Sequence, residues 1–188
     1  REHLGRRREE MSGIPWTIDT SAGEFALAGE NILYDSQSNV VAEYSGSRSL
    51  FRGISMYVSV GQSNYLLRRR RRLFRLWYEV IDDATGRLFA YATPLRFSGG
   101  RAWRLTDFQG NEMARCDTAS PTDMAIDMAD FISGAYDIII HGEPLFRCEG
   151  TFALQAPRLW PIKNSPLTPE QLQLCAVMVG MYMVWRRY

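Results

Sequence analysis

The stretch LQLCAVMVGMYMVW, residues 172–185, decides the fold of this chain. From Leu174 to Trp185 it holds no charged or strongly polar residue. A helix that is apolar on every side is either buried all round or lies in a bilayer, and spanning a bilayer takes about 20 apolar residues. We therefore expect a helix that fills the inside of a β-barrel. A membrane-inserted helix and a helix that docks into a partner are the alternatives.

The residues just before this stretch form a helix start. Thr168 suits the N-cap, Pro169 suits the first helical position, and Gln171 completes a capping box. A pair of arginines closes the stretch at the end where cations stabilise the helix dipole. The predicted helix covers about residues 169–187.

Short strand-like segments, separated by turn residues, occupy the chain from Trp16 to about Leu154. Between residues 73 and 81 alternate positions are apolar, the period of a half-buried strand. An apolar strand, a turn rich in Asp, Gly or Asn, and a second strand recur in four places: 31–45, 73–93, 103–116 and 136–148. Successive hairpins predict an antiparallel meander, either a sandwich or a barrel. With the apolar helix, we expect a mainly β fold: a closed antiparallel barrel around a C-terminal, all-apolar central helix.

One short amphipathic helix is predicted to interrupt the strands, with its N-cap at Ser120 and its stop at Gly134. Three carboxylates share one stripe of it: Asp123, Asp127 and Asp130. We expect a solvated face and no metal site, because the segment lacks the mid-loop glycine and the closing glutamate of a calcium loop.

The composition fits one domain. The chain has 188 residues, 46% of them hydrophobic and 23% charged, with a net charge of +1. We expect a solvated N-terminal arm over residues 1–15 and a single domain over 16–188. The balanced charge gives no overall field to attract nucleic acid. Three cysteines, an odd number, indicate a reduced compartment, so we expect an intracellular protein, cytoplasmic or at a membrane periphery.

Enzyme motifs are missing from the sequence. It contains no Gly-rich phosphate loop, no G-x-S-x-G elbow and no Cys-x-x-Cys pair. Cys116, Cys148 and Cys175 stand in apolar surroundings and suit packing. His141 lies at a hairpin turn with no identified nucleophile. We expect a non-enzymatic protein with no cofactor and no metal.

The strongest local charge is the arginine run Arg68, Arg69, Arg70, Arg71 and Arg72, followed by Arg75. In an extended chain alternate arginines point to opposite faces, so five cannot all be buried, and the run must be a loop or a protruding strand end. It is either a plain solvated turn or a contact for anionic lipid headgroups, RNA or an acidic protein. RNA fits less well, because the neighbouring aromatic residues follow the run and suit a core.

Two segments carry a resemblance to a known family: the hairpin residues ILYD (32–35) and VVAEY (40–44), and the terminal segment 175–183. Together they resemble the tubby C-terminal-like superfamily. The first is similar to the opening hairpin of LURP-one-related proteins, and the second to the last helix of phospholipid scramblases. The resemblance covers most of residues 16–188 in pattern. No functional residue is transferred, since the chain has no calcium loop of the scramblase kind and no alignable tubby phosphoinositide site.

This resemblance implies a closed barrel around a central helix and a non-enzymatic protein that binds lipid headgroups, such as phosphoinositides, or other proteins. We expect a peripheral binding module that contacts anionic phospholipid or an acidic protein surface through the arginine run, with nucleic acid not expected. The alternatives are a structural or assembly subunit that binds other proteins, and a phospholipid scramblase.

Overall fold

The computed structural model describes residues 14–20, 30–49, 53–73, 75–94, 103–118, 136–149, 158–162 and 166–185. The described strands are β1 (Trp16–Thr20), β2 (Glu30–Tyr34), β3 (Val40–Ser49), β4 (Gly53–Val60), β5 (Ser63–Arg72), β6 (Arg75–Asp82), β7 (Leu88–Pro94), β8 (Trp103–Thr106), β9 (Glu112–Thr118), β10 (Tyr136–Ile140), β11 (Glu143–Glu149) and β12 (Arg158–Pro161). A helix, α3 (Pro169–Trp185), follows them.

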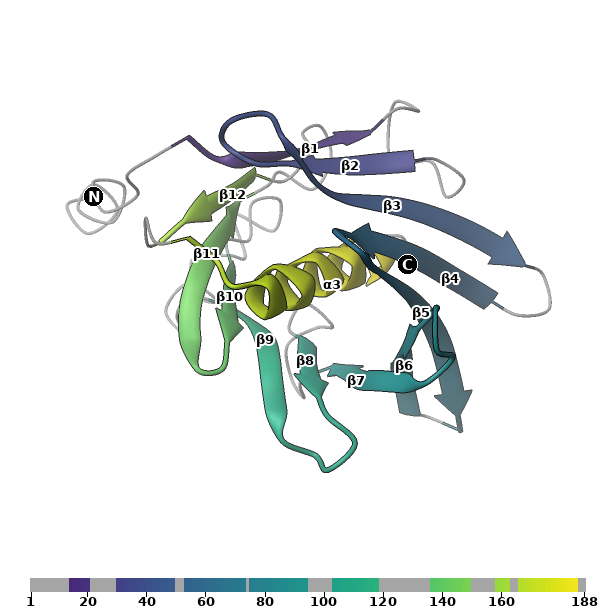
Figure 1. Ribbon diagram of the computed structural model, residues 1–188. Helices are drawn as coiled ribbons and strands as arrows, with labels where there is room; N and C mark the ends of the chain where they lie inside the picture. Colours follow the sequence, from purple (N-terminus) through teal and green to yellow (C-terminus); the bar gives the residue numbers. More distant parts are fainter. Residues whose placement is uncertain are drawn as a thin grey trace, which may run out of the picture.

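These strands form one closed antiparallel barrel (Figure 1). Each strand pairs with the next along the chain, and β1 closes the ring against β12 through pairs such as Trp16 with Leu159. A barrel has no free edge, so this pairing excludes the sandwich that the hairpin pattern alone had left open. The prediction of a mainly β fold, a closed antiparallel barrel of successive hairpins with a C-terminal helix, is confirmed.

Helix α3 runs inside the ring of strands (Figure 1). From Leu174 to Val184 every described side chain is buried, and the helix contacts β3, β4, β5, β8, β9 and β10. Its first turns differ from the expectation of an all-apolar helix, because Glu170 is exposed and Gln173 is only half-buried. These polar residues lie where the helix enters the barrel, so the apolar part begins one turn later than the helix itself.

The start of α3 has the capping box that the sequence predicts. The Thr168 backbone N–H donates to the Gln171 side chain (2.9 Å), and the Gln171 N–H donates to the Thr168 hydroxyl oxygen (3.2 Å). Gln173 also donates to the Ser63 hydroxyl at the start of β5. These bonds fix the helix start at the barrel end where the tight turns lie.

Gly180 lets the helix approach the barrel wall closely. A Cβ atom at this position would lie 3.0 Å from Val58 Cγ2 and 3.1 Å from Leu67 Cδ1. Next to this contact, the buried Tyr44 hydroxyl donates to the Ala176 carbonyl oxygen (3.1 Å). Burial raises the pKa of Tyr44 well above its ordinary value. The strands β3, β4 and β5 can therefore pack closely against the helix, because Gly180 has no side chain and because Tyr44 donates a hydrogen bond to the helix backbone.

Two hairpins on opposite sides of the ring repeat one another at an offset of 72 residues. The letters of 33–42, LYDSQSNVVA, and 105–114, LTDFQGNEMA, share Leu, Asp, Gln, Asn and Ala at equivalent places. Each hairpin shifts register just after its leucine, and the leucine and alanine are buried in both. The weak repeat seen in the sequence is therefore a structural one.

The turns of these two hairpins have the same hydrogen bonds. Asp35 Oδ1 accepts the N–H groups of Gln37 and Asn39, and Asp107 Oδ1 accepts those of Gln109 and Asn111. Each asparagine side chain donates back to the other aspartate oxygen. Aspartate in these turns is thus explained by turn chemistry.

Some predictions fall outside the described residues: the N-terminal arm up to residue 13, and the amphipathic helix of 120–133 with Asp123, Asp127 and Asp130. The segment of 53–72, by contrast, was left without a predicted hairpin and forms β4 and β5. The arginine run is the end of strand β5, which corrects the reading of it as a loop and keeps that of a protruding strand end.

Candidate functional site

The β5–β6 hairpin carries the arginine run at the end of the barrel opposite the start of α3. Pairing of β5 with β4 ends at Arg68, which lies opposite Ser55. Pairing of β5 with β6 continues to Arg72, which lies opposite Arg75. In turn, β6 pairs with β7 only from Tyr78 onward. Among the described residues, the last part of the hairpin therefore pairs only within itself, β5 with β6, as a two-stranded ribbon. We call residues 68–79 the arginine hairpin.

The arginines alternate between the two faces of this ribbon, as expected for an extended chain. Arg69 and Arg71 continue the inward-facing series of buried Tyr65 and Leu67. That series leaves the core at once, since Arg69 is half-buried and Arg71 is exposed. The even-numbered arginines, on the outer face, are all exposed.

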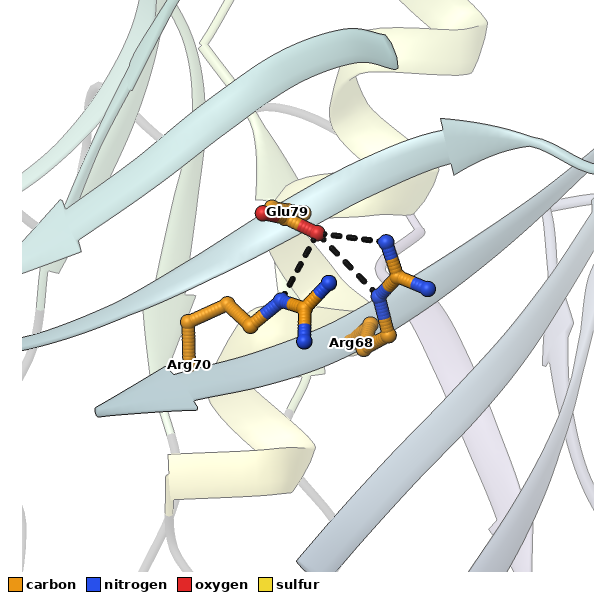
Figure 2. Close-up of polar contacts among 3 residues, drawn as sticks. All are labelled: Arg68, Arg70 and Glu79. Carbon is orange, nitrogen blue, oxygen red and sulfur yellow. Dashed lines mark hydrogen bonds and ion pairs between the residues drawn. The ribbon is translucent and has the colours of Figure 1, made fainter. Parts of the chain in front are cut away.

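Glu79 forms ion pairs with two of the outer arginines (Figure 2). Its Oε2 atom accepts hydrogen bonds from Arg68 Nη2 (2.7 Å) and Arg68 Nε (3.1 Å), and from Arg70 Nε (3.0 Å). The Glu79 side chain is 19% exposed. Partial burial by itself would raise its pKa, but the hydrogen bonds and charges of the two guanidinium groups outweigh it and hold the pKa of Glu79 below its ordinary value. This carboxylate is a fixed internal counterion that the sequence analysis missed.

One aromatic residue departs from the expectation that the aromatic neighbours of the run all lie in the core. Tyr78 is buried, as expected, but Trp77 lies opposite Arg70 on the outer face and is only half-buried. The sequence already indicated this position, because Trp77 and Glu79 are two residues apart on one strand and therefore lie on the same face.

The site residues of the sequence analysis are placed as follows. Arg68 and Arg70 are brought together by Glu79. Arg71 and Arg72 follow them along β5, nearer the tip, and Arg69 lies between Arg68 and Arg70 on the inward-facing side. Arg75 opens β6 directly opposite Arg72.

The other reactive residues have ordinary structural roles. All three cysteines are free and buried, and burial strongly raises the pKa of the Cys175 thiol. His141 Nε2 lies 3.1 Å from Glu170 Oε1, which joins the β10–β11 turn to the start of the helix. Among the described residues no group of three or more His, Cys, Asp or Glu side chains is placed to hold a metal.

An open pocket of about 310 Å³ lies at the tight-turn end, beside the first turns of α3. It is lined mainly by apolar side chains, among them Trp16, Val41 and Leu172, with Asp35 at its side. Both oxygens of Asp35 already accept hydrogen bonds within their own turn. The acidic side chain of this lining is therefore engaged in its own turn.

Comparisons of this chain with protein-family models, with curated proteins and with solved structures find no match. In the part of the chain that the structure describes, no helix has both the length and the apolar character needed to cross a membrane.

Proposed function

We propose that this protein is a non-enzymatic binding module that attaches to anionic phospholipid surfaces through the arginine hairpin. The observation that carries the proposal is the position of the arginines at the end of β5, where the described residues pair with β6 beyond their last described pair with β4. A charged ribbon held by a rigid barrel loses little conformational entropy when it meets a surface, which favours binding.

The charge of the hairpin supports this function. Residues 68–79 contain six arginines and one acidic residue, Glu79. Basic residues close to an anionic leaflet contribute about 1 kcal/mol each to binding. Glu79 is shared by Arg68 and Arg70, whereas Arg71 and Arg72, nearer the tip, are not paired with this carboxylate.

The opposite end of the barrel has the opposite character. Among the described residues, the turns at that end hold Asp35, Asp82, Asp83 and Asp107, against Arg87 and His141. An anionic surface would attract the hairpin end and repel the turn end. The charge distribution therefore favours a single orientation on a membrane, with the start of α3 pointing away from the lipid.

Membership of the tubby C-terminal-like superfamily is part of this proposal. A closed antiparallel barrel with a helix inside it is the architecture that the resemblance implies. The further detail, an all-apolar central helix, is supported by the burial of Leu174, Met178 and Val184. The scramblase alternative needs the helix in lipid, and the position of α3 among the strands does not favour it.

The experiment is a vesicle titration at two salt concentrations, with neutral phosphatidylcholine vesicles and vesicles that also hold phosphatidylserine or a phosphoinositide. Changing Arg69, Arg70 and Arg71 together to Gln should weaken binding to the anionic vesicles by about 3 kcal/mol at low salt. The loss should shrink at physiological salt, where the Debye length is about 8 Å. The unfolding free energy should change little through Arg70 and Arg71, because they are exposed and exposed charges contribute little to folding.

The matched control changes three exposed arginines outside the hairpin, Arg87, Arg104 and Arg158, to Gln. It removes the same net charge and should keep most of the binding. If both triple variants lose equal affinity, the attraction is general and not a property of the hairpin. If the parent protein does not prefer anionic vesicles, the lipid function is wrong and the assembly-subunit alternative, with an acidic protein partner, takes its place.

A further inference from the structure

The tip of the arginine hairpin presents a leucine to solvent. Leu73 is 80% exposed, the largest exposed fraction among the described large hydrophobic residues. Its backbone has φ +51°, a left-handed conformation. Because Arg72 pairs with Arg75, only residues 73 and 74 connect the two strands.

The backbone conformation of this leucine is unfavourable for its residue type. Two-residue hairpin turns favour Asn-Gly or Asp-Gly, because their residues adopt positive φ, whereas a left-handed conformation is unfavourable for a branched side chain. An exposed leucine also gains nothing from burial. Positions that break local rules without a visible structural gain are the ones where function is expected.

The surroundings of Leu73 indicate which surface it meets. Arg71 and Arg72, directly before it, are exposed, and Arg71 Nε lies 3.5 Å from the Leu73 carbonyl oxygen. An apolar tip followed by cations suits the surface of an anionic membrane, where charged headgroups lie over the hydrocarbon layer. Arginine side chains can lie along such a boundary with their charged ends in the headgroup layer.

We propose that Leu73 is an apolar anchor that enters the bilayer at the level of the upper acyl chains, while the arginines behind it contact lipid phosphates. This inference rests on the proposed function and deepens it: binding has a hydrophobic part that salt does not screen. The hairpin then attaches tip first.

The first experiment reports the depth of the tip. A Leu73→Cys variant is labelled with an environment-sensitive fluorophore, and the three buried native cysteines should stay unlabelled. With phosphatidylserine-containing vesicles, the emission should shift to the blue and be quenched more by acyl-chain nitroxide lipids than by headgroup nitroxide lipids. The matched control is Phe108→Cys, which is 74% exposed at the opposite end of the barrel, and its label should not respond.

The second experiment separates the anchor from the charges. Leu73→Gly removes the side chain and suits the left-handed backbone, so the variant should fold at least as well as the parent. Its affinity for anionic vesicles should fall roughly ten-fold, and the loss should persist at high salt.

The outcomes distinguish the two claims. If the parent binds anionic vesicles but Leu73→Gly binds equally well and the label at position 73 stays in water, the anchor is wrong and the lipid function survives. If the parent shows no preference for anionic vesicles, the proposed lipid function is wrong, and the proposal that Leu73 is an anchor is wrong with it.

Discussion

Glu79 restrains part of the positive charge of the arginine hairpin. Its carboxylate holds Arg68 and Arg70 along the outer face, so two guanidinium groups are engaged before any partner arrives. A phosphate that binds them has to compete with this carboxylate. The glutamate therefore sets how strongly the middle of the hairpin attracts anions, while the tip stays free to bind.

A Glu79→Gln variant should release both arginines. We expect binding to anionic vesicles to strengthen about three- to ten-fold at low salt, the equivalent of about one basic residue near the surface. The same vesicle titration measures it. Glu43→Gln, an exposed position on β3, removes the same charge away from the hairpin and should change affinity less. Weaker binding in the Glu79 variant would mean that the carboxylate positions the arginines for a ligand and does not compete with it.

Two important residues of the site were out of reach of the sequence. The pairing of Arg68 with Glu79 requires the hairpin register, which a turn of only two residues sets. Leu73 and Phe74 have none of the usual residues of such a turn, so the run of arginines looked like a loop. The alternation of faces, in contrast, follows from strand geometry alone and was predicted correctly for Tyr78 and Val80.

At the scale of elements, the repeated hairpins show how the sequence encodes this barrel. The pattern Leu-x-Asp-x-Gln-x-Asn-x-x-Ala sets a buried leucine, a register shift, a hydrogen-bonded turn and a buried alanine. This is why the hairpins of 31–45 and 103–116 could be predicted. The hairpin of β4 and β5 has no such turn, and its connection through Gly61 and Gln62 was missed.

The repeat provides a matched pair of turn variants. Ser38 (φ +65°) occupies the place that Gly110 (φ +89°) holds in the second hairpin. A left-handed backbone costs an L-residue about 1–2 kcal/mol. Glycine avoids this cost but loses more conformational entropy on folding. Ser38→Gly should therefore raise the unfolding free energy by up to about 1 kcal/mol. Gly110→Ser should lower it by a similar amount. Urea unfolding measures both, and equal signs for the two variants would contradict this account.

The turn aspartates also predict how stability depends on pH. The Asn111 side chain and the backbone N–H groups around the turn lower the pKa of Asp107 below its ordinary value. The unfolded chain then takes up a proton at a higher pH than the folded one. The contribution of Asp107 to stability is therefore complete above the ordinary pKa of aspartate and is lost as pH falls through the lower folded pKa.

Unfolding free energy measured by urea titration between about pH 5 and pH 2.5 checks this. Asp107→Asn should make the fall in stability toward low pH shallower than in the parent. The control is Asp19→Asn, which removes an exposed carboxylate on β1, away from these turns. A slope in the Asp107 variant as steep as that of the parent would show that the turn hydrogen bonds do not favour the charged form.

At the scale of the whole molecule, the barrel has two different ends joined by one apolar helix. Tight aspartate turns and the capped helix start form one end, and the arginine hairpin extends from the other. The helix could be predicted because no residue from Leu174 to Trp185 is charged or strongly polar, and such a segment is either buried all round or lies in a bilayer. Closure of the barrel was predicted, but not that β1 and β12 make it, since these strands are far apart in the sequence.

The last prediction concerns the helix as the core of the barrel. Met178 is fully buried between the strands, so Met178→Asp places an unpaired carboxylate in an apolar interior. A buried polar or charged group without a partner costs several kcal/mol, a large part of the 5–15 kcal/mol that holds a domain folded. The variant should unfold at much lower urea concentration, or fail to fold.

The control for this prediction is Phe108→Asp, which introduces the same charge at an exposed turn and should cost little. A milder second variant, Met178→Ala, keeps the interior apolar and should lower the unfolding free energy by about 2–5 kcal/mol through the cavity it leaves. Circular dichroism during urea unfolding gives both values. If Met178→Asp and Met178→Ala are both as stable as the parent, position 178 lies at a surface. A barrel built around this helix would then be wrong, because no other described segment is placed to fill its interior.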